Sequence, residues 1–138
     1  MDVQTAFLNP SLDDNECVYM ELPDGFINQM TKYLWLRKSL YSLKQAPRAW
    51  YKEIDHYLTS IGFKASAYDP NLYLYKDGHT ILVLYIDDLL IAVSPKYWAS
   101  SSSVTPIEIQ SNIKKLVELL SSKYKMVDLG TSMSFLGI

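Results

Sequence analysis

The chain has 138 residues, 49% of them hydrophobic, and its 13 Lys and Arg against 15 Asp and Glu give a formal net charge of −2. This composition excludes a disordered tail and fits a single domain, because nearly half of the residues can be buried to offset the entropy lost on ordering the chain. The single Cys17 and the two histidines, His56 and His79, exclude a disulfide framework and a Cys/His zinc site, so a catalytic metal would have to bind carboxylates. No apolar run approaches the roughly 18 residues of a membrane span, and the N-terminus lacks the pattern of a secretory signal, so we expect no membrane partner.

The first half of the chain predicts two short strands followed by a helix. Strands are expected over 18–22 and 33–37, and Pro23-Asp24-Gly25 predicts a turn after the first of them. A one-sided apolar stripe at spacings of three and four then predicts a helix from Pro47 to Ile61. Gly62 follows where a helix often ends in a left-handed residue.

The second half predicts three strands and a second helix. The strands are expected over 72–75, 80–85 and 89–94, and the Gly-containing segment 76–79 predicts a hairpin between the first two. These two strands alternate only weakly, which is typical of strands buried on both faces. A flexible Ser-rich loop is expected over 94–104.

The second helix begins with a recognisable N-terminal signal. Thr105-Pro106-Ile107-Glu108 forms a capping box with Pro at the first helical position, and an apolar stripe of helical period runs from Ile109 to Tyr124. Two amphipathic helices could cover one face of a small sheet. The expected fold class is therefore α+β.

Charge is distributed unevenly along the chain. Residues 1–30 contain six acids and no base, whereas residues 31–52 contain six bases and no acid. A basic segment beside an acidic one can hold a phosphate backbone near a metal site. The alternative is an ordinary solvated surface.

The most informative segment is ILVLYIDDLLIAV, residues 81–93, in which Asp87 and Asp88 are flanked by apolar residues. Burying carboxylates without partners costs several kcal/mol each, so a nearby cation is expected if the pair lies in a hairpin turn. Without a cation the adjacent carboxylates would repel each other. The alternative is a simple acidic turn, since Asp13-Asp14 shows the same dipeptide elsewhere in the chain.

A third carboxylate could join this pair. Asp2 ends or follows a strand, and residues 5–8 begin a turn or short helix. If that strand lies beside the Asp87-Asp88 hairpin, three carboxylates could hold two metal ions roughly 3.5–4 Å apart, an arrangement that stabilises in-line phosphoryl displacement. Mg²⁺ suits such a site, because it binds one or two carboxylates together with substrate phosphates.

Five segments, in this order, resemble the reverse transcriptase of copia-type LTR retrotransposons. They read MDVQTAFLN, KSLYSLKQAPRAWY, YDPNLYLY, LYIDDLLIA and KMVDLGTSMSFLGI, and the similarity covers essentially the whole chain. The resemblance implies a partial reverse transcriptase domain over residues 1–138, with an antiparallel polymerase palm covered by two helices on one face and part of the fingers. It also implies an RNA-directed DNA polymerase that uses two Mg²⁺ ions, with Mn²⁺ as a substitute. The partners would be an RNA or DNA template with a primer and deoxynucleoside triphosphates.

The resemblance also implies roles for individual residues. Asp2, Asp87 and Asp88 match the catalytic aspartates, with Asp2 and Asp87 as metal ligands, Asp88 completing the acidic cluster and the carbonyl of Val3 as a further ligand. Phe7 matches the aromatic residue that lies beneath the incoming sugar and blocks a 2′-hydroxyl group. Its alternative role is that of a core phenylalanine.

Residues 41–48 match the segment that runs along the nucleotide and template. Tyr41 and Ser42 are then expected at the nucleotide. Lys44, Gln45 and Arg48 are expected at the nucleic acid, although the two cations could equally be solvated residues at a helix start.

The sequence departs from the family pattern at three positions. Ser42 replaces a usual Gly and could keep the nucleotide at a distance, since Gly allows closer backbone approach. Pro10 stands where a Gly commonly follows the Asn, and Val127 replaces a frequent Lys, which leaves Lys125 as a nearby proton donor to pyrophosphate.

Both ends of the chain read as cut. We expect a fragment or decayed copy that lacks further fingers, thumb and ribonuclease H segments of a parent polyprotein, and that is inactive by itself. The resemblance implies location in a cytoplasmic virus-like particle. Two rival interpretations remain open, a non-catalytic remnant that keeps an αβ core with weak nucleic-acid binding, and a carboxylate metal-binding domain that is indifferent to nucleotides.

Overall fold

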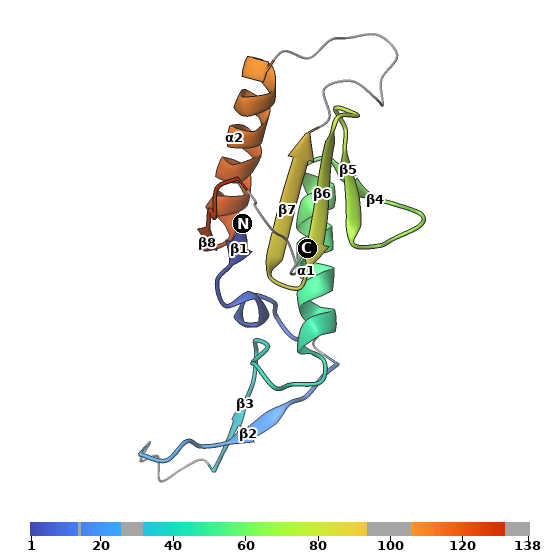
Figure 1. The fold of residues 1–138 in the computed structure, drawn as a ribbon. Helices are drawn as coiled ribbons and strands as arrows, with labels where there is room; N and C mark the ends of the chain where they lie inside the picture. The colour runs from blue at the N-terminus through green and yellow to red at the C-terminus, as the bar shows by residue number, and fades with distance from the viewer. Residues whose placement is uncertain (14, 26–31, 94–105, 132–138) are drawn as a thin grey trace.

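A computed structural model of the chain describes residues 1–13, 15–25, 32–93 and 106–131. Within these residues the protein is α+β, with two α-helices and mainly antiparallel sheet, as predicted (Figure 1). In chain order the elements are β1 (Asp2–Val3), the 3-10 helix η1 (Ala6–Leu8), β2 (Tyr19–Glu21), β3 (Tyr33–Trp35), α1 (Ala46–Ser60), β4 (Phe63–Ala65), β5 (Leu72–Tyr75), β6 (Thr80–Tyr85), β7 (Asp88–Val93), α2 (Pro106–Lys123) and β8 (Met126–Val127).

The main sheet has the strand order β4-β5-β6-β7-β1-β8, and its neighbouring strands are antiparallel. β2 and β3 form a separate two-stranded ribbon, which lies beyond the N-terminal end of α1 in Figure 1. The short β1 lies between β7 and β8. Backbone hydrogen bonds fix it there, from Val3 N to Asp87 O at 2.8 Å and from Leu89 N to Met1 O at 2.8 Å. The N-terminal segment is thereby held beside the turn that joins β6 to β7.

The core lies between the two helices and one face of the sheet. Pairing of Leu84 with Leu89 places these side chains on the face toward the helices, together with Leu82. The buried side chains that meet them come from α1 and α2, and they are Trp50, Ile54, Leu58, Leu116 and Leu120. The apolar stripes that predicted the two helices therefore supply the core, as an amphipathic helix should.

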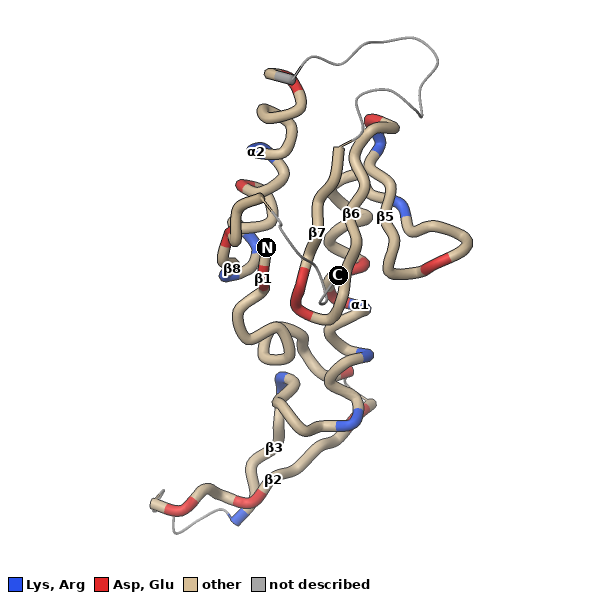
Figure 2. Tube along the Cα trace, in the orientation of Figure 1, with Lys and Arg blue, Asp and Glu red and all other residues tan. Residues whose placement is uncertain are grey.

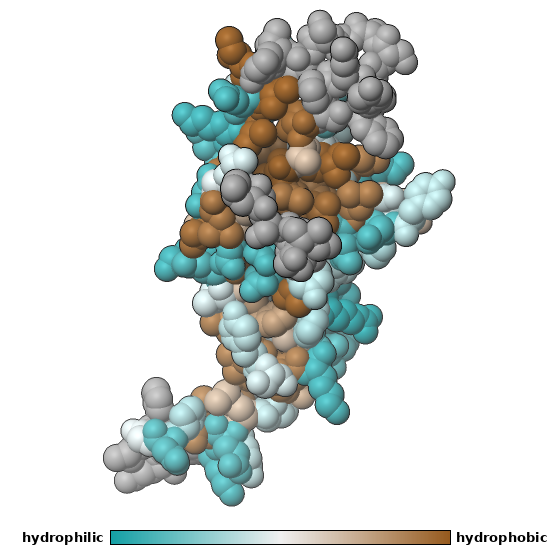
Figure 3. Space-filling view, in the orientation of Figure 1, coloured by the Kyte–Doolittle hydropathy of each residue, from teal (hydrophilic) through white to brown (hydrophobic). Residues whose placement is uncertain are grey.

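The opposite face of the sheet is also apolar but less covered. Ile81, Val83 and Leu90 are half-buried there, and Leu74 is 42% exposed. Figure 3 shows hydrophobic side chains gathered over the strands on this face. β5 and β6 were expected to be buried on both faces. They are buried on the face toward the helices and only partly buried on the other.

Contacts between aromatic side chains join the two helices. The Tyr57 hydroxyl group donates to the Leu119 carbonyl at 2.6 Å. Tyr124, directly after α2, packs edge-on against Trp50 and Tyr57 with ring centroids 5.3 and 5.4 Å apart. Burial, together with the nearby Glu53, raises the pKa of the Tyr124 hydroxyl above its usual value.

The predicted elements are present, with two additions. α1 begins one residue before Pro47 and is followed by Gly62 at φ 105°, as expected. β4 and β8 were not predicted, because two or three residues are too few to show a period. The expected Ser-rich loop over 94–104 and the capping residue Thr105 lie outside the described residues. Neither helix within the described ranges has the length and apolar content needed to cross a bilayer.

The hairpin between β5 and β6 is stabilised by Asp77, which gives a testable pH dependence. Its carboxylate accepts hydrogen bonds of 2.7–2.8 Å from the backbone N–H groups of His79 and Thr80 and from the Thr80 hydroxyl. Burial alone would raise the Asp77 pKa, but these hydrogen bonds outweigh it and hold the pKa below its usual value of 3.8. A carboxyl with a lowered folded-state pKa contributes stability above its unfolded pKa, and this contribution is lost as the pH falls through the folded value.

We therefore expect the free energy of unfolding of the wild type to fall more steeply between pH 5 and pH 3 than that of Asp77→Asn. Urea titrations at several pH values measure this difference. Asp24→Asn, which removes an exposed carboxylate, is the control and should keep the wild-type slope. Equal slopes for wild type and Asp77→Asn would contradict the role of Asp77.

Candidate active site

The turn between β6 and β7 carries the Asp87-Asp88 pair. Tyr85 pairs with Asp88, so Ile86 and Asp87 form a two-residue connection. Ile86 has φ 54°, which matches the first central residue of a type II′ hairpin turn. Positive φ is costly for a β-branched residue, by about 1–3 kcal/mol, and such strain is concentrated at functional sites.

Asp2 lies directly opposite Asp88 in the antiparallel pairing of β1 with β7. Directly opposed residues have Cβ atoms about 4.5–5.5 Å apart. Because Val3 and Leu89 point into the core, Asp2 and Asp88 both lie on the opposite, more open face. Figure 2 shows the acidic positions of β1 and of the β6–β7 turn side by side. The predicted meeting of Asp2 with the doublet is thus present in the fold.

The three carboxylates do not form a closed ligand shell. Within the described ranges, no group of three His, Cys, Asp or Glu side chains is placed to hold a metal ion. Asp2, Asp87 and Asp88 are half-buried, and among the described residues none of their carboxylates has a hydrogen-bonding or ionic partner. Like charges directly opposite each other destabilise a sheet, and hard oxygen ligands are those that Mg²⁺ prefers. Three carboxylates are thus oxygen donors of the kind that a divalent cation binds, although their side chains are not arranged as a ligand group in this structure.

Val3, the expected backbone ligand, has its side chain in the core and its N–H bonded to the Asp87 carbonyl. Val127, which the sequence resemblance sets against a frequent Lys, pairs with Asp2 from β8 and is 38% exposed. A Lys at this position would bring an ammonium group close to the Asp2 carboxylate. The departure at Val127 therefore lies next to the acidic residues, which sequence spacing does not reveal.

Phe7 and Tyr41, two of the residues expected at the nucleotide, are in contact. Their rings meet edge-on with centroids 5.3 Å apart. Phe7 also packs against the core, so its alternative role as a core residue agrees with the same position. A pocket of about 200 Å³ lies between Phe7 and the β6–β7 turn, and it is lined by Phe7, Pro47, Trp50, Tyr51, Asn71, Leu84, Tyr85 and Ile86.

Ser42, the third residue expected at the nucleotide, has φ 71°. This left-handed conformation is one that Gly adopts freely and that costs other residues roughly 1–2 kcal/mol. The position therefore favours Gly, the residue that the sequence resemblance led us to expect, for a backbone reason independent of any ligand.

Replacing Ser42 with Gly is expected to raise the free energy of unfolding by roughly 0.5–1 kcal/mol, because relief of the positive φ exceeds the extra entropy of Gly when unfolded. Ser42→Ala, which keeps the positive φ without the hydroxyl, is the matched control and should not gain stability. Chemical denaturation measures both variants. A loss of stability in Ser42→Gly would contradict the strain at this position.

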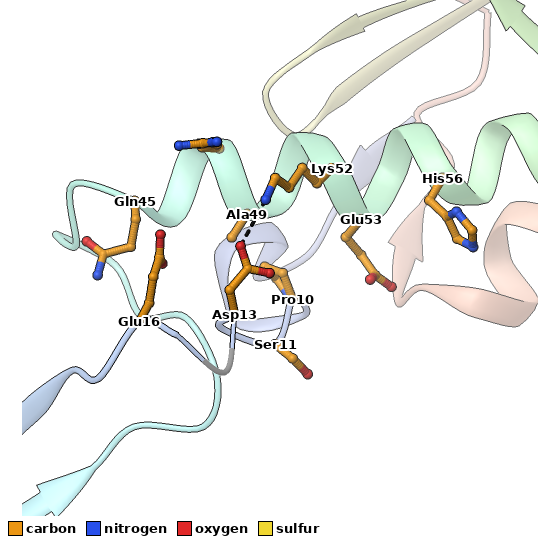
Figure 4. A pocket seen from close by; sticks show the side chains of 10 residues that line it. Pro10, Ser11, Asp13, Glu16, Gln45, Ala49, Lys52, Glu53 and His56 are labelled. Carbon is orange, nitrogen blue, oxygen red and sulfur yellow. Dashed lines mark hydrogen bonds and ion pairs between the residues drawn. The ribbon is translucent and has the colours of Figure 1, made fainter.

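Lys44, Gln45 and Arg48, the residues expected at the nucleic acid, lie near the N-terminal end of α1. Successive helical residues are rotated by about 100°, so Arg48 points roughly 160° away from Trp50, which faces the β6–β7 turn. Gln45 and Arg48 line a pocket of about 260 Å³ on this outer side of α1 (Figure 4). Lys44, Gln45 and Arg48 also border a wider depression with Glu16, Cys17 and Val18.

Acidic residues from the N-terminal segment face these cations. Lys52 forms an ion pair with Asp13 at 2.9 Å, and Glu16 lines the same pocket as Arg48. The hydrogen bond and charge of Lys52, with a smaller contribution from Arg48, hold the Asp13 pKa below its usual value. The acidic and basic blocks of the sequence are therefore partly neutralised against each other in space.

One residue of the site was not predicted from the sequence. The Trp50 indole Nε1 donates to the carbonyl of Ile86 at 2.6 Å, so α1 is bonded to the strained turn beside Asp87. In the sequence, Trp50 is only one member of the apolar stripe that predicts the helix. A buried Trp with an N–H group that needs a partner was the available signal.

The chain is similar to known proteins along its whole length. Residues 1–138 match the family described as reverse transcriptase (RNA-dependent DNA polymerase). The chain is 47% identical over 95 residues to the retrovirus-related Pol polyprotein from transposon RE1 of Arabidopsis thaliana, a match covering 66% of this chain and 6% of that protein. It is 36% identical over 143 residues to the retrovirus-related Pol polyprotein from transposon TNT 1-94 of Nicotiana tabacum, covering 100% of this chain and 10% of that protein.

A third relative is the putative transposon Ty5-1 protein of Saccharomyces cerevisiae, which is 36% identical over 143 residues and is covered over 41% of its length. The chain therefore spans less than half of the length of each of these three relatives. No solved structure matches the chain significantly.

Proposed function

Because the chain belongs to the reverse transcriptase (RNA-dependent DNA polymerase) family, we propose that it is part of an RNA-directed DNA polymerase, with residues 1–138 forming its palm and part of its fingers. The reaction would be attack of a primer 3′-hydroxyl group on the α-phosphate of a deoxynucleoside triphosphate. The observation that carries this proposal is the pairing of Asp2 with Asp88 beside Asp87. It joins two segments of the chain that are far apart in sequence and that both match catalytic motifs of the family.

The carboxylates of Asp2, Asp87 and Asp88 would hold two divalent cations, with the Val3 carbonyl as a further oxygen ligand. Mg²⁺ is the expected ion and Mn²⁺ a substitute, because both bind hard oxygen ligands. Bound ions would stabilise the charge on the attacking and leaving oxygens. The carboxylates themselves would hold these ions in place and balance their positive charge.

Substrate binding would be divided between the two sides of α1. The contact of Phe7 with Tyr41 near the turn supports a nucleotide position there, with Ser42 in the same segment. Lys44, Gln45 and Arg48, on the outer side, would contact template or primer phosphates. The ion pair of Asp13 with the neighbouring Lys52, and the acidic Glu16 in the same pocket, indicate a modest contribution to affinity.

The parent protein of this function would be a Pol polyprotein, as the names of two relatives state for those proteins. Further polymerase and ribonuclease H segments would then be partners of this domain. A non-catalytic remnant is the second candidate, and the net charge of −2 with paired acids along α1 favours weak nucleic-acid binding of that kind.

Primer extension tests the proposed function. Residues 1–138 would replace the matching segment of the tobacco relative, and extension of a DNA primer on an RNA template would be measured with Mg²⁺ or Mn²⁺. We expect extension by this chimaera, none by its Asp87→Asn variant, and normal extension by the control Asp24→Asn. The 138-residue chain alone is expected to extend little or nothing.

A folded chimaera without activity would contradict catalytic competence and would favour the remnant. Extension that survives Asp87→Asn would contradict the assigned carboxylates. Robust extension by the 138-residue chain would contradict the expectation that this segment needs its neighbours.

A further inference from the structure

We infer that Trp50 is a positioning residue that holds the β6–β7 turn, and with it Asp87 and Asp88, in place for the reaction. This inference rests on the proposed function. Trp50 is 2% exposed, and its indole N–H donates to the Ile86 carbonyl at 2.6 Å. The bond joins α1 to a residue 36 positions away, directly before the acidic doublet.

The turn needs such a contact because its conformation is not favoured locally. Ile86 has φ 54° and a half-exposed side chain, so core packing contributes little to holding it. A strained backbone persists only when the surrounding structure fixes it. The indole in turn needs an acceptor, because a buried N–H without one costs free energy. The hydrogen bond therefore gives the buried indole N–H its acceptor and, at the same time, fixes the backbone of the turn.

Trp50 also contacts a residue close in sequence to the strand that pairs with Asp2. Its ring packs edge-on against Tyr124 with centroids 5.3 Å apart. Tyr124 lies two residues before β8, which pairs with β1 at Val127 and Asp2. One aromatic contact therefore connects the support of the Asp87-Asp88 turn with the strand that fixes Asp2. This geometry sets the relative positions of the carboxylates from inside the core.

The test compares Trp50→Phe with Tyr73→Phe in the 138-residue chain. The first variant keeps an aromatic ring but removes the N–H donor. The second is a matched control, because Tyr73 is fully buried and also loses one hydrogen bond, that from its hydroxyl to Asp55 at 2.9 Å. Two readouts are measured, the NMR amide shifts of Asp87 and Asp88 and the affinity for Mn²⁺ alone by electron paramagnetic resonance.

We expect Trp50→Phe to move the amide resonances of Asp87 and Asp88 and to weaken Mn²⁺ binding about threefold to tenfold, the range set by one net hydrogen bond. Tyr73→Phe should leave both readouts at wild-type values even where it lowers the melting temperature. Unchanged hairpin shifts and Mn²⁺ affinity in Trp50→Phe would overturn the inference. So would equal changes in the control, because the effect would then be general destabilisation.

Failure of the proposed function can be distinguished from failure of the inference about Trp50. If the wild type binds no Mn²⁺, the metal-site proposal fails, whereas the amide shifts still decide whether Trp50 holds the turn. If Trp50→Phe does not fold, hydrogen exchange of the Trp50 indole N–H in the wild type tests the bond to Ile86 instead. Slow exchange of the indole proton supports the bond to Ile86, and exchange at the rate of an exposed indole would overturn it.

Discussion

Asp88→Asn is expected to make the metal-free chain more stable while removing its ability to bind Mn²⁺. Asp2 and Asp88 are directly opposed and, within the described part of the chain, their carboxylates have no partner to offset their repulsion. Removing one like charge from such a pair should raise the free energy of unfolding by about 0.2–1 kcal/mol. The Mn²⁺ affinity should fall by at least about 10- to 100-fold, since removal of even an outer partner of a metal ligand has that effect.

Denaturation in the presence of a chelator and Mn²⁺ titration measure the two effects separately. Glu21→Gln is the control, because Glu21 is an exposed strand residue opposite Tyr33 and has no like-charged neighbour across the ribbon. It should change neither quantity. A destabilised Asp88→Asn chain that still binds Mn²⁺ would contradict the carboxylate pair as a metal site.

Leu82→Ala is expected to cause the largest loss of stability, about 2–5 kcal/mol, because it leaves a cavity in the core. Leu82 is 0% exposed and lies in the cluster shared by α1, α2 and the sheet. A loss of this size is a large part of the roughly 5–15 kcal/mol that stabilises a typical domain.

Leu74→Ala is the matched control for this prediction, since the same side chain is removed from the opposite face of the sheet, where Leu74 is 42% exposed. Its cost should be well under half of that for Leu82→Ala. Urea unfolding followed by circular dichroism measures both. Equal costs would show that the two faces are equally packed and would contradict the position of the core.

Periodic elements of the fold were predictable, because burial on one side leaves a pattern along the chain. The stripe through Trp50, Ile54 and Leu58 predicted α1, and the hydrophobic segments on either side of Asp87-Asp88 predicted the strands β6 and β7, which the structure joins as a hairpin. The meeting of Asp2 with this hairpin was also predicted, since the motif resemblance supplied a long-range pairing that periodicity does not contain.

Features that depend on tertiary contacts could not be read from the sequence. The bond from Trp50 to Ile86 joins two elements whose separate patterns contain no sign of each other. The acidic and basic blocks are separate in the sequence, but the ion pair of Asp13 with Lys52 brings them into contact in the fold. From the sequence, the replacement of Gly by Ser42 was expected to matter only for how closely a nucleotide can approach. The positive φ of Ser42 shows that it also matters for the backbone.

The most direct test of the central claim is a crystal of the chain soaked in Mn²⁺, with anomalous diffraction recorded at the manganese edge. We expect an anomalous peak within about 2.5 Å of carboxylate oxygens from Asp2 and from Asp87 or Asp88, the distance range of hard cations and their oxygen ligands. A chain that binds its manganese elsewhere, with no peak between β1 and the β6–β7 turn, would contradict this claim.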